Sequence, residues 1–134
     1  MPMSAIRYFW PTAITLAVIV YATISEDPTP DLDLPLIPHL DKLIHAIMFG
    51  GLAGSAFFDL QRSNRSRRRG AAAMGLICLC VAVLGALDEV AQATLTAERA
   101  GDFYDWLADC TGIAVAFVAA PPAVRAVLHI KSNL

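Results

Sequence analysis

The stretch Gly85–Gly112, with the sequence GALDEVAQATLTAERAGDFYDWLADCTG, decides how this chain is organised. It begins inside one apolar segment and ends inside the next one. Its charged and amide side chains are Asp88, Glu89, Gln92, Glu98, Arg99, Asp102, Asp105 and Asp109. Ionisable groups are costly to place in lipid, so a dense cluster of them between two apolar segments is first interpreted as a functional site.

The composition indicates a membrane protein. Of the 134 residues, 57% are hydrophobic and 16% are charged, whereas soluble domains average about 45–50% and about 25%. The apolar residues gather in four blocks, at about residues 8–25, 41–60, 70–95 and 103–128. Each block is long enough, or nearly so, for a membrane-spanning helix. We therefore expect an all-α polytopic membrane protein, with four transmembrane helices in one bundle and a single domain over residues 1–134.

The first apolar block has a second interpretation. Arg7 followed by an apolar run resembles the beginning of a signal peptide. The run is long, however, and Tyr21–Ser25 is a poor match to the small-residue cleavage site that signal peptides carry. We therefore prefer a membrane span for this block.

Arginines between the second and third blocks orient the chain. Five arginines fall in Asp59–Arg69, and the positive-inside rule places such a segment in the cytoplasm. Four spans then put both termini in the cytoplasm, where Arg7, Arg125 and Lys131 also fall. Apart from Asp59, the acidic residues fall in or beside the two outer segments. Because membrane spans flank the arginines, we expect no nucleic-acid partner.

Polar side chains cluster at the outer ends of three of the expected helices. They are Asp41, Lys42 and His45 in the second helix, Asp88, Glu89 and Gln92 in the third, and Asp102, Asp105 and Asp109 in the fourth. Spacings of three and four residues place side chains on one helical face. At 1.5 Å per residue, Glu89 and Asp109 should lie roughly 6–10 Å below their helix ends. The three helices are therefore predicted to present their ionisable groups to one outward-facing pocket.

Helix ends and packing faces carry further signals. Asp41 follows the turn at Pro38 and is expected to cap the second helix. The pair Pro121–Pro122 is expected to kink or end the fourth helix. The glycines of Gly50–Gly54 permit close approach of another helix, either within the bundle or in a homo-oligomer.

The polar pattern resembles that of the VanZ-like family of small bacterial integral membrane proteins. The family pattern is D-K-x-x-H, then E-x-x-Q, an arginine, an aspartate, and D-x-x-x-N/D-x-x-G. The corresponding residues here are Asp41, Lys42, His45, Glu89, Gln92, Arg99, Asp102, Asp105, Asp109 and Gly112. Order and spacing agree from Asp41 to about Phe117. The sequence departs at Phe49, where a tyrosine is often found, and at Asp109, where asparagine is common.

The resemblance implies a four-helix protein of the bacterial cytoplasmic (inner) membrane. It also implies a link to resistance against glycopeptide antibiotics, teicoplanin in particular, through the founding member of the family. It supplies no settled biochemical activity, and resistance would then be a side effect of some role in the cell envelope.

One hypothesis is an enzyme that acts on a lipid-linked or cell-envelope ligand at the outer leaflet. His45 would be the general acid or base, oriented by Asp41 or by a carboxylate from another helix. Glu89 and Asp109 would complete the catalytic set, or would hold a divalent cation together with His45. The ligand-binding set would be Lys42, Gln92, Arg99, Asp102 and Asp105, with Asp41, Asp88 and Gly112 in structural or orienting roles. The positively charged side chains of Lys42 and Arg99 would bind a phosphate or carboxylate group of the ligand.

Other interpretations stay open alongside the enzyme. A second hypothesis is a non-catalytic protein that binds membrane lipid, a peptidoglycan precursor or a glycopeptide-type small ligand. A third is a metal or proton path, although Ala71–Leu87 carries no charge, which argues against transport through a monomer. A fourth is a charged network that only holds the helices together, although such contacts average only about 0.6 kcal/mol.

Overall fold

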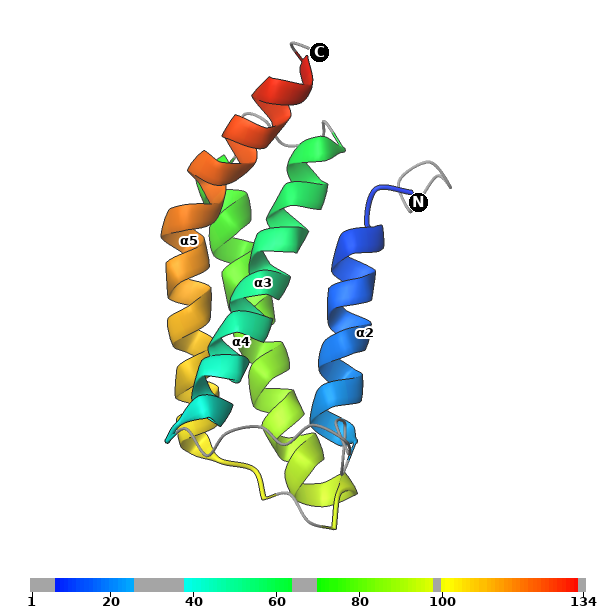
Figure 1. Ribbon diagram of the computed structural model, residues 1–134, viewed down its shortest axis with the longest axis vertical. Coiled ribbons are helices and arrows are strands. Elements are labelled where there is room, and N and C mark those ends of the chain that lie inside the picture. Colours follow the sequence, from blue (N-terminus) through cyan, green and yellow to red (C-terminus); the bar gives the residue numbers. More distant parts are fainter. Residues whose placement is uncertain (1–6, 26–37, 64–69, 98–99, 133–134) are drawn as a thin grey trace.

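The computed structural model describes residues 7–25, 38–63, 70–97 and 100–132. These residues form four α-helices: α2 (Trp10–Ile24), α3 (Leu40–Arg62), α4 (Gly70–Leu95) and α5 (Phe103–Ser132). The helices lie side by side and alternate in direction (Figure 1). We call the end of the bundle where α3 and α5 begin the lower end, and the end where α4 begins the upper end, as they stand in Figure 1.

Three of the helices, α3, α4 and α5, are long and apolar enough to cross a membrane. Helix α2 is also apolar but has only 15 residues, which makes it the shortest of the four. The described part of the chain contains no strand. The all-α prediction is therefore confirmed, and each helix begins and ends within a few residues of the apolar block that predicts it.

The apolar core lies between α3, α4 and α5. Its most deeply buried side chains, with one contribution from α2, are Ile19, Phe49, Leu52, Ala53, Phe57, Met74, Val81 and Ile113. Many large apolar side chains instead point outward, among them Ile47 of α3, Leu79 of α4 and Val118 of α5, each more than half exposed. A soluble protein rarely exposes so much contiguous apolar surface, so these faces suit contact with lipid.

The start of α3 differs from the sequence prediction. The prediction that Asp41 caps this helix is wrong, because His39 occupies the N-cap position with a φ of 62°, and Asp41 lies in the first turn. The Asp41 carboxylate contacts Lys42 Nζ at 3.1 Å. A negative charge in the first turn nevertheless favours the helix through its dipole.

The paired prolines of α5 do not end the helix, which continues past Pro121 and Pro122 to Ser132. Each proline lacks an N–H group and removes one hydrogen bond to the preceding turn. The C-terminal, red part of α5 leans away from its orange part in Figure 1. Of the two outcomes predicted for this pair, a kink or an end, the helix therefore shows the kink.

Glycines bring α3 and α5 together. A Cβ atom added to Gly112 would lie 1.9 Å from the carbonyl oxygen of Ala46, and one added to Gly50 would lie 2.8 Å from that of Gly112. Only residues without a side chain fit where two helix backbones come this close. Gly50 therefore serves packing within the chain, whereas a Cβ at Gly51 or Gly54 would meet nothing within 4 Å.

A buried carboxylate fastens α2 to α3 at the upper end. Asp59 of α3 is 0% exposed, and its Oδ2 accepts hydrogen bonds from Thr12 N at 3.0 Å and Thr12 Oγ1 at 2.6 Å. Thr12 lies in the first turn of α2, where the N-cap residue Phe9 offers no side-chain hydrogen bond. Asp59 therefore caps α2 from the neighbouring helix. Arg62 completes the cluster, 3.3 Å from Asp59 Oδ1.

Candidate functional site

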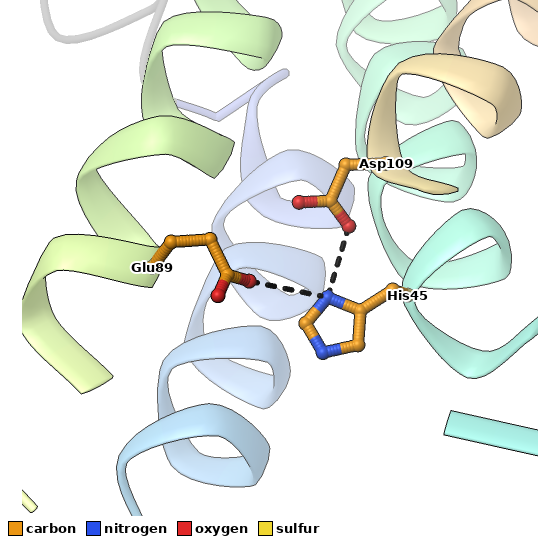
Figure 2. Close-up of side chains that lie close together, drawn as sticks. All are labelled: His45, Glu89 and Asp109. Carbon is orange, nitrogen blue, oxygen red and sulfur yellow. Dashed lines mark hydrogen bonds and ion pairs between the residues drawn. The ribbon is translucent and has the colours of Figure 1, made fainter. Parts of the chain in front are cut away.

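Three ionisable side chains from three helices meet inside the lower half of the bundle (Figure 2). His45 comes from α3, Glu89 from α4 and Asp109 from α5. The Nδ1 atom of His45 lies 3.0 Å from Asp109 Oδ1 and 3.8 Å from Glu89 Oε1. The side chains are buried, with exposed fractions of 7% for His45, 8% for Glu89 and 0% for Asp109. We call these residues the triad.

The triad leaves two buried oxygen atoms without a hydrogen-bond partner, Glu89 Oε1 and Asp109 Oδ2. The other two carboxylate oxygens are engaged: Glu89 Oε2 accepts a hydrogen bond of 2.8 Å from the backbone N–H of Asp102, and Asp109 Oδ1 lies against the ring of His45. Buried polar atoms are nearly always paired, and an unpaired one points to strain, to chemistry or to an absent ligand. The triad thus keeps two buried acceptor atoms that no described donor uses.

Packing around the triad fixes its geometry. The ring of His45 is stacked on Phe49, with the ring centroids 6.4 Å apart and the planes within 10°. Asp109 faces Gly85 of α4, where a Cβ atom would lie 2.9 Å from Asp109 Oδ2. Gly101 fits closely against the backbone of Glu89, since a Cβ there would lie 2.5 Å from the Glu89 carbonyl oxygen. The Asp109 carboxylate therefore occupies room that Gly85 provides, and Gly101 lets the start of α5 approach the backbone of Glu89.

Sequence reasoning missed both of these glycines. Gly85 lies four residues before Glu89 on the same helix, and Gly101 directly precedes Asp102. Their position beside Glu89 and Asp102 in the sequence could have marked them as neighbours of the site. The face that each glycine turns to its neighbour, however, depends on how the helices are rotated against one another.

Beside the triad, Lys42 joins α3 to the start of α5. Its Nζ lies 3.0 Å from Asp105 Oδ1, 3.1 Å from Asp41 Oδ2 and 3.5 Å from Asp102 Oδ2. Asp102 also caps α5, because its Oδ1 accepts a 2.8 Å hydrogen bond from Tyr104 N. The four residues Asp41, Lys42, Asp102 and Asp105 form a partly exposed group that we call the charged rim.

The remaining predicted site residues lie elsewhere. Gln92 Nε2 donates to Asp88 Oδ2 at 3.0 Å, and Thr23 Oγ1 of α2 donates to Asp88 Oδ1 at 2.7 Å. These bonds link α4 to α2, and among the described residues none joins Asp88 or Gln92 to the triad. Arg99 lies outside the described residues. Of the two candidates for orienting His45, Asp109 is the one in contact with the ring, since Asp41 contacts Lys42.

Glu89 also borders a surface cavity of about 370 Å³ near the lower end. Asp102, Phe103 and Trp106 line the same cavity. The indole of Trp106 is held in place because its Nε1 donates a 3.0 Å hydrogen bond to the carbonyl oxygen of Ala82. The cavity thus combines two carboxylates with two aromatic rings and leads from the surface to one member of the triad.

Together, the apolar helices and the buried triad define a small helical membrane protein with an ionisable cluster inside its helical bundle. The chain belongs to the VanZ/LLP1 family, whose model matches residues 1–125. The resemblance seen in the sequence motifs is thereby confirmed. A search of curated proteins found no match to the chain, and a search of solved structures found none either.

Proposed function

We propose that this VanZ/LLP1 protein crosses the bacterial cytoplasmic (inner) membrane four times and uses its lower end to bind, and act on, a cell-envelope or lipid-linked ligand. Both termini would be cytoplasmic, and the triad would lie in the half of the bundle nearer the outer side of the membrane. The arginine-rich segment Asp59–Arg69 supports this orientation. The first residues of α2 and the last of α5 both lie toward the upper end of the bundle, as an even number of spans requires (Figure 1).

The short helix α2 needs an explanation within this proposal. At 1.5 Å per residue its 15 residues extend about 22 Å, less than the roughly 30 Å of a hydrocarbon core. A short span is accommodated when the bilayer thins or when flanking residues extend to the interface. Tyr8 and Trp10, both exposed at the start of α2, are side chains that membrane interfaces favour.

The observation that carries the proposal is the buried triad with its two unpaired carboxylate oxygens. Polar contacts between membrane helices contribute on average about 0.6 kcal/mol each, so three ionisable groups are a poor means of holding helices together. Groups of this kind at membrane depth mark functional sites by default. The triad would be the reactive centre, with His45 able to accept or donate a proton.

The charged rim and the neighbouring cavity would receive the ligand. The rings of Phe103 and Trp106 offer apolar faces, while Glu89 and Asp102 offer hydrogen-bond acceptors. Such a combination suits a headgroup rich in hydroxyl or amine donors. Lys42 would orient an anionic part of the ligand, in exchange for one of its present contacts with Asp105 or Asp102.

Resistance to teicoplanin tests the function directly. A susceptible Gram-positive strain would express the wild-type chain, His45→Gln, or His129→Gln as a control at the upper end. We expect the wild type and the control to raise the inhibitory concentration of teicoplanin, and His45→Gln to lose the increase at equal membrane content. Full resistance with His45→Gln would contradict a functional triad.

A binding measurement covers the case in which resistance is not the physiological role. Protein in nanodiscs would be titrated with a lipid-linked peptidoglycan precursor, followed by analysis of the recovered precursor. Binding with conversion supports an enzyme, and binding without conversion supports a receptor. If neither occurs, and if His45→Gln only lowers the unfolding temperature, the triad is a structural network and the proposed function fails.

Cysteine labelling tests the orientation. The native residues Cys78, Cys80 and Cys110 would be replaced by alanine, and single cysteines introduced by Thr29→Cys and Ser66→Cys. We expect a membrane-impermeant maleimide to label the first in intact cells and the second only after permeabilisation. The reverse pattern would place the triad on the cytoplasmic side and contradict an outward-facing site.

A further inference from the structure

We propose that His45, Glu89 and Asp109 bind one divalent transition-metal ion of the Mn²⁺ or Zn²⁺ class. The inference concerns the same site as the proposed function, but it depends only on the chemistry of the triad. It would hold whether the protein converts a ligand or only binds one.

The geometry of the triad is close to that of a three-ligand metal site. One potential ligand atom from each residue lies within 4.8 Å of the other two. Ligands bound to one ion at about 2.0–2.2 Å stand about 3.0–3.5 Å apart. The 3.0 Å between His45 Nδ1 and Asp109 Oδ1 already meets this spacing, and the 3.8 Å to Glu89 Oε1 exceeds it only slightly. Figure 2 shows both carboxylates directed at the same ring nitrogen from different helices.

The unpaired oxygens supply a second and independent observation. Glu89 Oε1 and Asp109 Oδ2 are buried acceptors with no donor among the described residues. Leaving such an atom unpaired costs about 1–3 kcal/mol, and more when the group is charged. One cation bound by Glu89 Oε1 and by both carboxylate oxygens of Asp109 would satisfy both atoms at once. The remaining oxygen of Glu89 is held by the backbone of Asp102, as outer contacts commonly orient a metal ligand.

The local charge also favours a cation. Two ionised carboxylates and a neutral imidazole carry a charge of −2, which a divalent ion cancels. The charged rim adds three carboxylates, Asp41, Asp102 and Asp105, against the single ammonium group of Lys42. The net charge of the described surroundings therefore favours a cation over an anion. An anionic headgroup would reach this place more readily as an additional ligand of a bound metal, because three protein ligands leave a coordination position open.

The donor set limits which metal fits. Calcium and magnesium prefer sites made wholly of oxygen, and the imidazole of His45 disfavours them. Copper(I) prefers thiolate and thioether ligands, of which the triad has none. One imidazole with two carboxylates suits Mn²⁺ and Zn²⁺.

Metal retention by the purified protein tests the inference. The tag-free full chain in detergent would be stripped with EDTA, dialysed against Mn²⁺, Zn²⁺ or Mg²⁺, and analysed by mass spectrometry for bound metal. We expect about one equivalent of Mn²⁺ or Zn²⁺ per chain, no retained Mg²⁺, and a higher unfolding temperature with metal. Glu89→Gln and Asp109→Asn should each weaken binding by at least about tenfold.

The matched control is Asp59→Asn, which neutralises an equally buried carboxylate at the upper end. It should bind metal like the wild type even if it unfolds at a lower temperature. If the triad variants do not fold, Co²⁺ bound to the wild type would still report the site through its visible absorption. A wild type that retains no metal and shows no Co²⁺ spectrum overturns the inference, as does equal retention by Glu89→Gln.

The outcomes separate this inference from the proposed function. A bound metal, combined with full resistance and unchanged ligand handling in His45→Gln, would support the metal site and contradict the function. A chain without metal whose function still depends on His45 would support the function and contradict the metal.

Discussion

Gly112 of α5 lies directly against Ala46 of α3, so closely that a methyl group on Gly112 would stand 1.9 Å from the Ala46 carbonyl oxygen. Ala46 follows His45 in the chain, and Gly112 lies three residues after Asp109. The close backbone contact therefore sits within one turn of the 3.0 Å contact between His45 and Asp109. The contact that packs α3 against α5 therefore also determines how His45 and Asp109 lie relative to each other.

The first prediction concerns this contact. Gly112→Ala should force α3 and α5 apart, because the new Cβ meets backbone atoms that cannot move aside. We expect a loss of roughly 1–3 kcal/mol or more of stability, together with loss of the function of the site. Denaturant titration in detergent measures the first effect, and the resistance or binding assay the second.

The control for this variant is Gly51→Ala, on the face of α3 where a Cβ meets nothing within 4 Å. It should leave stability unchanged or raise it by up to about 1 kcal/mol, because alanine favours a helix more than glycine does. If both variants lose the same stability, close packing at Gly112 is not the cause.

The sequence predicts the depth of the site residues better than it predicts the direction in which they point. Depth follows from counting residues from each helix end, which places Glu89 and Asp109 at similar levels. Direction depends on how each helix is rotated about its axis. Asp88 and Glu89 are neighbours in sequence, yet Asp88 turns to Thr23 of α2 while Glu89 turns to the triad.

Other features depend on contacts that no local pattern reveals. Asp59 looks like one more charge beside an arginine-rich segment, but it is buried because the first turn of α2 brings unpaired N–H groups to it. The wrong prediction for Asp41 has a local cause. Pro38 marks the turn correctly, but His39 takes the left-handed conformation and α3 begins two residues earlier than a cap at Asp41 would allow.

The second prediction separates the triad from the packing of α3 and α5. Gly85→Ala would place a Cβ 2.9 Å from Asp109 Oδ2, the far end of a fully buried side chain that must shift to make room for it. The carboxylate should therefore turn away from His45. We expect metal binding to weaken by about tenfold to a hundredfold, as when an outer contact of a metal ligand is lost. Titration of the EDTA-treated protein measures the change.

Gly75→Ala, on the same helix but with open space around its Cα, is the matched variant. It should bind metal as the wild type does. An unchanged affinity in Gly85→Ala would show that Asp109 is free to adjust, and that the room provided by Gly85 does not hold it in place.

The third prediction follows from the excess of acidic groups. Lys42→Met removes the one ammonium group of the charged rim and leaves its carboxylates without their partner. Metal affinity should therefore rise, and the increase should shrink between low and high salt, because mobile ions screen partly exposed charges. Titrations at two ionic strengths measure it. Arg125→Met makes the same change of charge at the upper end and should leave metal affinity unchanged. A lower affinity in Lys42→Met would contradict the electrostatic argument.

The fourth prediction concerns α2, which is tied to the bundle by polar bonds near both of its ends. Thr23→Val removes the 2.7 Å hydrogen bond to Asp88 at the lower end, and Asp59→Asn weakens the cap on Thr12 at the upper end. We expect each change to cost about 1–2 kcal/mol. Because the two bonds share no partner, the double variant should lose the sum of both within about 0.5 kcal/mol. Unfolding of all three variants in detergent measures this. A double variant that loses no more than Asp59→Asn alone would mean that α2 detaches as a unit once its upper end is released.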